Sequence, residues 1–297
     1  MPCFHPLDAW QCSNGDVVFT DNLARNDVIR RLALPCGRCV GCRLERSRQW
    51  AVRCMHEASM HMFNSFVTLT YDDDHLPEYN SLNYKHFQDF MKRLRKSHNG
   101  VRFYMCGEYG EDFSRPHYHA LLFNCFFPDR KKHSIGDSGS VIYTSEALTK
   151  LWPYGFSTIG DVTFESAAYV ARYITKKITG EKADDHYKGK LPEYTTMSRG
   201  GNVKGSRGLG SSWFKDYKLD VFPSDQVVLR GKVMKPPRAY DKWLEQDDVG
   251  QYTTIKLDRK AKALENAADN TAARLKAKEQ CKLAQFALLK RGMENEA

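Results

Sequence analysis

The sequence predicts an α+β domain in which helices flank a central antiparallel sheet. Residues 64–71 alternate in polarity and are rich in β-branched and aromatic side chains, which is typical of a strand. Residues 84–94 repeat apolar side chains at helical spacing. Further strands are expected over 101–106, 117–123 and 155–162. Since these elements lack the regular βαβ spacing of a doubly wound fold, an antiparallel sheet is the better prediction.

The composition favours an acidic partner. The 297 residues include 45 Lys and Arg against 36 Asp and Glu, a formal charge of +9, and nucleic acid is the commonest partner of so basic a chain. The first residues lack the basic start and apolar run of a signal peptide, and no stretch has the apolar length of a membrane span. We therefore expect a soluble, intracellular protein.

Three cysteines follow two consecutive C-x-x-C spacings, at Cys36, Cys39 and Cys42. In a reducing compartment, nine cysteines point to metal ligands or free thiols rather than disulfides. A structural zinc ion usually takes four ligands, so a fourth must come from elsewhere. The candidates are Cys3, which we prefer, and two alternatives, His5 and Cys12. An iron–sulfur cluster is the chemical alternative to Zn²⁺.

The strand that begins at Pro116 carries two histidines on one face. Because side chains alternate along a strand, His117 and His119 point the same way and could hold a divalent metal. On its own, this pattern fits a pair of surface or hydrogen-bonded structural histidines better than a metal site. Glu108 lies on a segment that would pair with this strand as a hairpin, and it would complete a set of two nitrogens and one oxygen.

Such a set leaves open positions that suit Mg²⁺ or Mn²⁺ and phosphate oxygens. Because the turn geometry is open, Glu111 and Asp112 are alternatives to Glu108 as the carboxylate ligand.

A helix is expected over residues 166–180, with an apolar stripe and a terminal glycine. Tyr169 and Tyr173 are four residues apart and, with Lys176, are predicted to lie opposite that stripe, away from the core. Two helical tyrosines are usually core residues, but here the periodicity favours a reactive surface. A metal that polarises a phosphate, and a lysine that offsets developing charge, would make a tyrosine hydroxyl a useful nucleophile.

As a set, these residues resemble the HUH endonuclease superfamily, specifically the rolling-circle replication initiators (Rep) of small single-stranded DNA phages of the microvirus, gokushovirus-like type. Residues 66–71 look like the family's first motif, residues 115–119 match its His-hydrophobic-His motif, and residues 169–176 match its paired-tyrosine motif with a trailing lysine. The resemblance covers roughly residues 1–245 and is specific only as a set.

The resemblance implies an HUH palm and a nickase that also transfers strands. One tyrosine would attack the origin phosphodiester, leaving a 5′-phosphotyrosyl link and a 3′-hydroxyl that primes synthesis. The second would cut the regenerated origin, and strand joining would release circular single-stranded DNA. The implied partners are single-stranded origin DNA, supercoiled duplex phage DNA, and the host helicase and polymerase, in the bacterial cytoplasm.

We expect four parts along the chain: a Cys-rich segment with a basic helix (1–60), the nuclease core (61–180), a basic Gly-rich loop with accessory elements (181–250) and a C-terminal helix (251–297). The loop over residues 198–210 either tracks a DNA backbone or is simply flexible, and residues 257–291 are predicted as one long helix. The candidate DNA contacts are Arg43, Arg46, Arg115, Arg172, Lys177, Arg199, Lys204 and Arg207.

Two rival readings remain. A plasmid relaxase or single-strand transposase would share the histidines and tyrosines. A zinc-stabilised DNA-binding regulator without catalysis would leave the tyrosine face unexplained.

Overall fold

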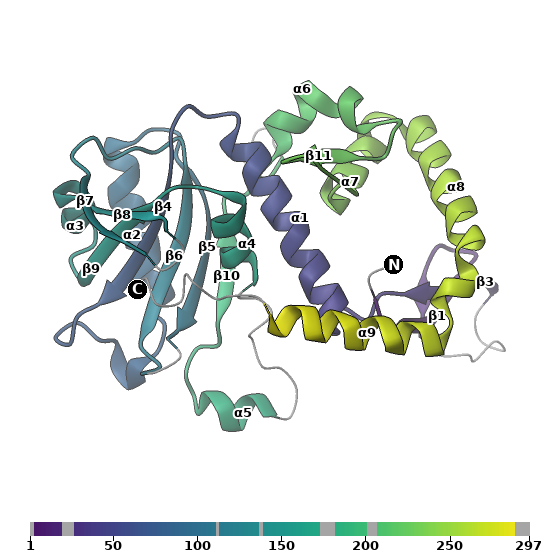
Figure 1. The fold of residues 1–297 in the computed structure, drawn as a ribbon, viewed down its shortest axis with the longest axis horizontal. Helices are drawn as coiled ribbons and strands as arrows, with labels where there is room; N and C mark the ends of the chain where they lie inside the picture. The colour runs from purple at the N-terminus through teal and green to yellow at the C-terminus, as the bar shows by residue number, and fades with distance from the viewer. Residues whose placement is uncertain are drawn as a thin grey trace. The chain divides into compact units, whose positions relative to one another are not determined.

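The computed structural model describes residues 3–19, 27–110, 113–136, 139–172, 182–200 and 207–288 (Figure 1). The chain divides into two compact units. One comprises residues 1–46 and 253–290, and the other comprises residues 47–252 and 291–297.

The larger unit is built on a seven-stranded sheet with the order β10-β5-β6-β4-β9-β8-β7 (Figure 1). All of its neighbouring strands pair antiparallel. Its strands are β4 Asn64–Tyr71, β5 Arg102–Tyr109, β6 Pro116–Phe123, β7 Lys131–Ile135, β8 Val141–Thr144, β9 Gly155–Gly160 and β10 Tyr194–Met197. The predicted α+β class with a central antiparallel sheet is confirmed.

The central strand β6 is buried along its whole length and separates two cores. On one face, Tyr118, Ala120 and Leu122 pack with the apolar side of α2 (Tyr84–Ser97). On the other, Leu121 and Phe123 pack with α1 (Val40–Ala58) and α4 (Phe164–Arg172). Helices therefore lie on both faces of the sheet, which is why β6 combines a Pro-His start with a nearly continuous apolar run.

Short polar side chains cap two helices of this unit. The Asn83 side chain accepts a hydrogen bond from the Lys85 N–H at the start of α2, and Ser145 accepts one from the Leu148 N–H at the start of α3 (Glu146–Leu151). The unit also contains the 3₁₀ turn η1 Glu78–Asn80, the helices α5 Lys182–Tyr187, α6 Ser211–Val221 and α7 Arg238–Asp247, and the hairpin β11 Val227–Leu229 with β12 Lys232–Met234.

The smaller unit contains a three-stranded antiparallel sheet, β2-β1-β3, that the sequence did not suggest. Its strands are β1 Leu7–Cys12, β2 Val17–Val18 and β3 Val28–Leu34.

The single long helix predicted over 257–291 is wrong. The structure has α8 Val249–Glu265, a 3₁₀ turn η3 Ala267–Asn270 and α9 Ala272–Ala287. The break lies where Asn and Thr side chains bond to nearby backbone groups: the Asn266 amide donates to the Lys262 carbonyl (2.7 Å), and the Thr271 hydroxyl accepts from the Arg274 N–H (3.5 Å). Such local bonds compete with helix continuation without any proline or glycine.

Within the described ranges, no helix combines the length and the apolar character that a membrane crossing requires.

Candidate active site

Two histidines and one glutamate meet on the face of the sheet that α4 covers. The antiparallel register places Glu108 of β5 directly opposite His117 of β6, as the expected hairpin requires. His117 Nε2 lies 2.6 Å and His119 Nε2 2.9 Å from the same carboxylate oxygen, Oε1 of Glu108. All three side chains are buried, and their ligand atoms lie within 4.8 Å of one another. This arrangement is compatible with one metal ion.

The other ring nitrogens are held by second partners. His117 Nδ1–H donates to the Arg115 carbonyl oxygen (3.1 Å), while His119 Nδ1 and the Thr68 hydroxyl are hydrogen-bonded at 2.9 Å. A carbonyl oxygen can only accept, so a neutral His117 keeps its lone pair at Nε2, as a metal ligand must. That lone pair faces Oε1 of Glu108 at 2.6 Å, and two electron-rich atoms repel each other at this distance. A positive charge between them, from either a proton on Nε2 or a metal ion, removes the repulsion.

The remaining carboxylate oxygen supports the metal. Glu108 Oε2 is buried and has no hydrogen-bond partner among the described residues, although a buried carboxylate oxygen is costly to leave without one. Burial raises the pKa of Glu108, but when Nε2 of His117 and His119 carries a proton, the hydrogen bonds from these rings hold it below its ordinary value. One carboxylate and two imidazoles are a donor set that fits a divalent cation.

Tyr169 of α4 reaches this cluster. Its hydroxyl lies 3.4 Å from both Glu108 Oε1 and His119 Nε2, and its ring meets the His119 ring edge-on, with 5.1 Å between centroids. The predicted outward orientation is wrong, because Tyr169 is only 5% exposed. The periodicity argument assumed one buried face, whereas α4 packs on the sheet and also receives a hydrogen bond from Ser47 of α1 to the Ala168 carbonyl.

Tyr173 and Lys176 of the predicted tyrosine motif lie outside the described residues. The same holds for the candidate DNA contacts Lys177 and Lys204 and for the alternative carboxylates Glu111 and Asp112.

Four cysteines form a second cluster, in the smaller unit. The sulfurs of Cys3, Cys36, Cys39 and Cys42 lie within 4.8 Å of one another. Backbone N–H groups of Cys36 and Cys39 donate to the sulfurs of Cys3 and Cys36, each at 3.3 Å. Burial opposes the shift, but N–H groups of Cys39 and Arg38 lower the pKa of Cys36 to about 7. This cluster is also compatible with a metal ion.

Of the three fourth-ligand candidates, the structure brings Cys3 to the cluster. His5 instead contacts Glu279, with 2.7 Å between Nε2 and Oε2.

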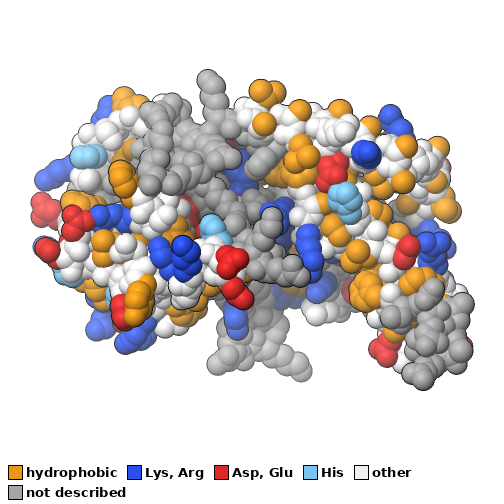
Figure 2. Space-filling view, turned by 90° about the horizontal axis from the view of Figure 1, so that it is seen from below, with side chains coloured by type: hydrophobic (Ala, Val, Ile, Leu, Met, Phe, Trp, Pro, Cys, Tyr) orange, Lys and Arg blue, Asp and Glu red, His pale blue; other side chains and the backbone are white. Residues whose placement is uncertain are grey.

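The candidate DNA contacts are spread over the chain. Among the coloured side chains of Figure 2, Lys and Arg are interspersed with Asp and Glu, so the charge has to be considered residue by residue. Arg46 and Arg199 are exposed, while Arg43 and Arg172 are half-buried. Arg115 pairs with Asp73 and donates to the Tyr71 carbonyl (2.8 Å); Arg207 pairs with Asp247 (2.5 Å).

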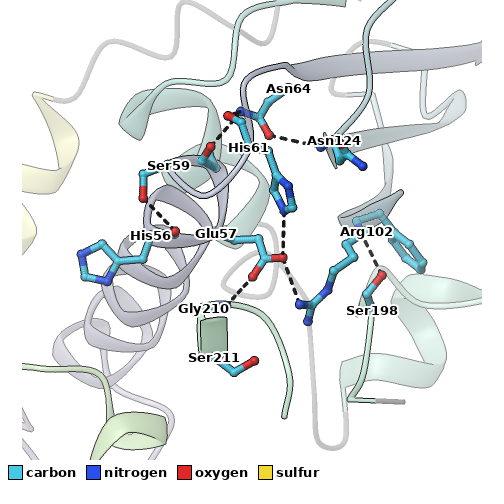
Figure 3. Close-up of polar contacts among 12 residues, drawn as sticks. His56, Glu57, Ser59, His61, Asn64, Arg102, Asn124, Ser198, Gly210 and Ser211 are labelled. Atoms are coloured by element: carbon cyan, nitrogen blue, oxygen red, sulfur yellow. Dashed lines mark hydrogen bonds and ion pairs between the residues drawn. The ribbon is translucent and has the colours of Figure 1, made fainter. Parts of the chain in front are cut away.

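Sequence reasoning missed a buried glutamate that holds one end of the Gly-rich segment (Figure 3). Glu57 of α1 accepts hydrogen bonds from the Gly210 N–H (2.7 Å) and pairs with Arg102 (3.1 Å). At the other end, Ser198 exchanges hydrogen bonds with the backbone of Phe103, next to Arg102. Residues 198 and 210 are thus tied to adjacent points of the larger unit. Nothing in the local pattern around Glu57 distinguishes it from a solvated helical glutamate.

Comparison with known proteins places this chain in a family. Residues 64–178 match the family model described as "Replication-associated protein ORF2/G2P". This range includes the three motif segments described above, at residues 66–71, 115–119 and 169–176. The chain is similar to the replication-associated protein VP4 of Bdellovibrio phage phiMH2K, at 33% identity over 277 residues, covering 90% of this chain and 84% of the relative.

It is also similar to the replication-associated protein ORF2 of Spiroplasma virus 4, at 34% identity over 83% of this chain and 81% of the relative. For the replication-associated protein ORF4 of Chlamydia phage 1, the identity is 34% over 67% of this chain and 50% of the relative. No solved structure matches the chain significantly. The chain belongs to the replication-associated protein ORF2/G2P family of microvirus- and gokushovirus-like phages.

Proposed function

We propose that this protein is a metal-dependent DNA nickase and strand transferase that starts and ends rolling-circle replication of a circular single-stranded phage genome. The observation that supports this most is the position of the Tyr169 hydroxyl, 3.4 Å from both Glu108 and His119. A phenol beside a metal-compatible group is the arrangement expected of a nucleophile that attacks a metal-polarised phosphodiester.

The reaction divides between the cluster and the tyrosine. Mg²⁺ or Mn²⁺ held by His117, His119 and Glu108 would polarise the scissile phosphate. Attack by the Tyr169 oxygen forms the O–P bond of a 5′-phosphotyrosyl link and breaks the bond from phosphorus to the 3′-oxygen. The phenol loses its proton and the 3′-oxygen gains one. Because the phosphodiester energy is retained, the reverse step can join strands.

Tyr173 would act as the second nucleophile, and Lys176 would offset developing negative charge; both assignments rest on the sequence motif. Partners of the reaction would be single-stranded origin DNA and supercoiled duplex phage DNA, with the host helicase and polymerase extending the free 3′-hydroxyl in the bacterial cytoplasm.

We assign Zn²⁺ to the four-cysteine cluster. Four thiolates are a closed set of ligands, which suits a structural rather than a catalytic ion.

Covalent trapping tests the nickase proposal. The protein is incubated with origin-containing single strands and Mg²⁺ or Mn²⁺, and DNA–protein adducts are resolved under denaturing conditions. Wild type should form an adduct that EDTA prevents, and mass spectrometry of the adduct would name the tyrosine and the phosphate. The double variant Tyr169→Phe/Tyr173→Phe should form none, whereas Tyr217→Phe, on an exposed part of α6, should behave as wild type.

The histidines separate cleavage from binding. His119→Ala should abolish the adduct while leaving much of the charge-driven DNA affinity. An adduct that persists in the double tyrosine variant would refute the proposal. A wild type that binds DNA but forms no adduct would favour the non-catalytic regulator.

A further inference from the structure

A row of side chains crosses the sheet from the candidate active site. The register aligns Glu108 of β5 with His117 of β6, His117 with Thr70 of β4, and Thr70 with Phe156 of β9. Directly opposed residues of antiparallel strands project to the same face, so Phe156 lies on the face that carries the histidines. A parallel row joins His119 to Thr68 and Thr158.

Beyond the histidines, these two rows form the floor of a groove. The groove has a volume of about 650 Å³ and is lined by Thr68, Thr70, Thr158 and Phe156, together with residues 71–74 and Arg115. Phe156 is 71% exposed, although it stands on an interior strand of the sheet. A single exposed apolar residue is ordinary on a protein surface, but an aromatic ring with hydroxyls beside it in a groove is a typical lining for a flat, partly polar ligand.

The groove adjoins the metal-compatible cluster directly. Thr68, on its floor, is hydrogen-bonded to His119 Nδ1. With strands spaced about 4.8 Å apart, Phe156 lies two strand spacings, roughly 10 Å, from His117 across the sheet. A ligand group in the groove can therefore be covalently joined to a phosphate at the cluster.

The charges of the groove select which part of a nucleotide enters. Asp72, Asp73 and Asp74 line the groove together with Arg115, whose guanidinium pairs with Asp73, so the carboxylates outnumber the one cation of this lining and disfavour a phosphate there. The neutral floor offers an aromatic face for stacking and hydroxyls that both donate and accept hydrogen bonds. This combination fits a base better than a phosphate.

We propose that the groove binds an unpaired base next to the scissile phosphate, stacked on Phe156 and hydrogen-bonded by the threonine hydroxyls; this inference rests on the proposed nickase function. Phe156 is then a positioning residue, which holds the substrate strand without touching the reacting atoms. Since base–aromatic stacking is sequence-tolerant, the threonines supply any preference among bases.

Replacement of the ring tests the proposal. Phe156→Ala should weaken binding of the origin strand about 10-fold, while adduct formation at saturating DNA stays within about 2-fold of wild type. Phe156→Trp should bind at least as tightly as wild type. Tyr79→Ala is the matched control, because Tyr79 is 78% exposed but does not line the groove, and its affinity should not change.

The base is found with single abasic substitutions along the strand around the mapped nick. One abasic position should weaken wild type about 10-fold and Phe156→Ala hardly at all, because both changes remove the same stacking contact.

The base subsite would be refuted if wild type and Phe156→Ala bound the strand equally tightly, or if the effect of every abasic position were the same in both proteins. Adduct formation by wild type would still support the nickase. Absence of any wild-type adduct would refute the nickase itself, and with it this inference, whatever the affinities.

Discussion

The buried pair between Glu57 and Arg102 should be among the strongest single contributions to the stability of the larger unit. The Glu57 side chain is 1% exposed and that of Arg102 is 24% exposed, so water can replace little of what Glu57 loses and only part of what Arg102 loses. Glu57→Ala removes the partner of the Arg102 guanidinium and leaves the Gly210 N–H without its acceptor. Breaking a buried pair from one side costs about 3–5 kcal/mol.

Thermal unfolding of the full chain measures this cost. For a unit of this size, 1 kcal/mol lowers Tm by about 2–4 °C, so Glu57→Ala should lower it by roughly 6–20 °C. Glu57→Gln keeps an acceptor for the Gly210 N–H but loses the charge, so its Tm should lie between those of wild type and Glu57→Ala. Glu245→Gln, on an exposed part of α7, is the control and should stay within about 0.5 kcal/mol of wild type.

The double variant Glu57→Ala/Arg102→Ala isolates the pair. Its loss should be smaller than the sum of the two single losses by about 1–3 kcal/mol, because the second substitution removes a charge already left unpaired. Two results would contradict this role of the pair. One is additive losses of unfolding free energy in the single and double variants. The other is a Glu57→Ala protein whose unfolding free energy lies within about 1 kcal/mol of wild type, well below the range for buried pairs.

Two further outcomes are expected. Burial lowers the pKa of His56 from 6.5 to about 4, so between these values the unfolded chain binds a proton that the folded chain does not. The free energy of unfolding should therefore fall as the pH drops from 6.5 towards 4. Chemical denaturation at several pH values should show a smaller dependence of this free energy on pH in His56→Gln. Elemental analysis should find zinc in wild type and in Cys281→Ser, at an exposed position, but not in Cys3→Ser; equal zinc in both variants would exclude Cys3 as a ligand.

The metal-compatible cluster was predictable because its geometry is local. Strand alternation places His117 and His119 on one face, and a hairpin limits the carboxylate ligand to a few residues near its turn, of which Glu108 pairs directly with His117. The four-cysteine cluster was predictable in part, since three of its members share close spacing and Cys3 had only to be chosen from a few candidates.

The features that escaped prediction depend on distant packing. The orientation of Tyr169 follows from α4 being buried on two sides, which a single helical stripe cannot reveal. Glu57 and Gly210 are 153 residues apart, so no local pattern announces their bond. The break between α8 and α9 was signalled by Asn266 and Thr271, but weakly, because each such residue also occurs within helices.

The placement of the metal-compatible histidines on β6 has a consequence for how the site behaves in time. The strand is hydrogen-bonded to β4 on one side and β5 on the other, and every one of its residues is buried. Opening such a strand requires nearly global unfolding, so its amide hydrogens should exchange among the slowest in the protein. The geometry of the three metal-compatible side chains is therefore as durable as the fold, and any movement that admits a ligand has to occur in the segments around β6.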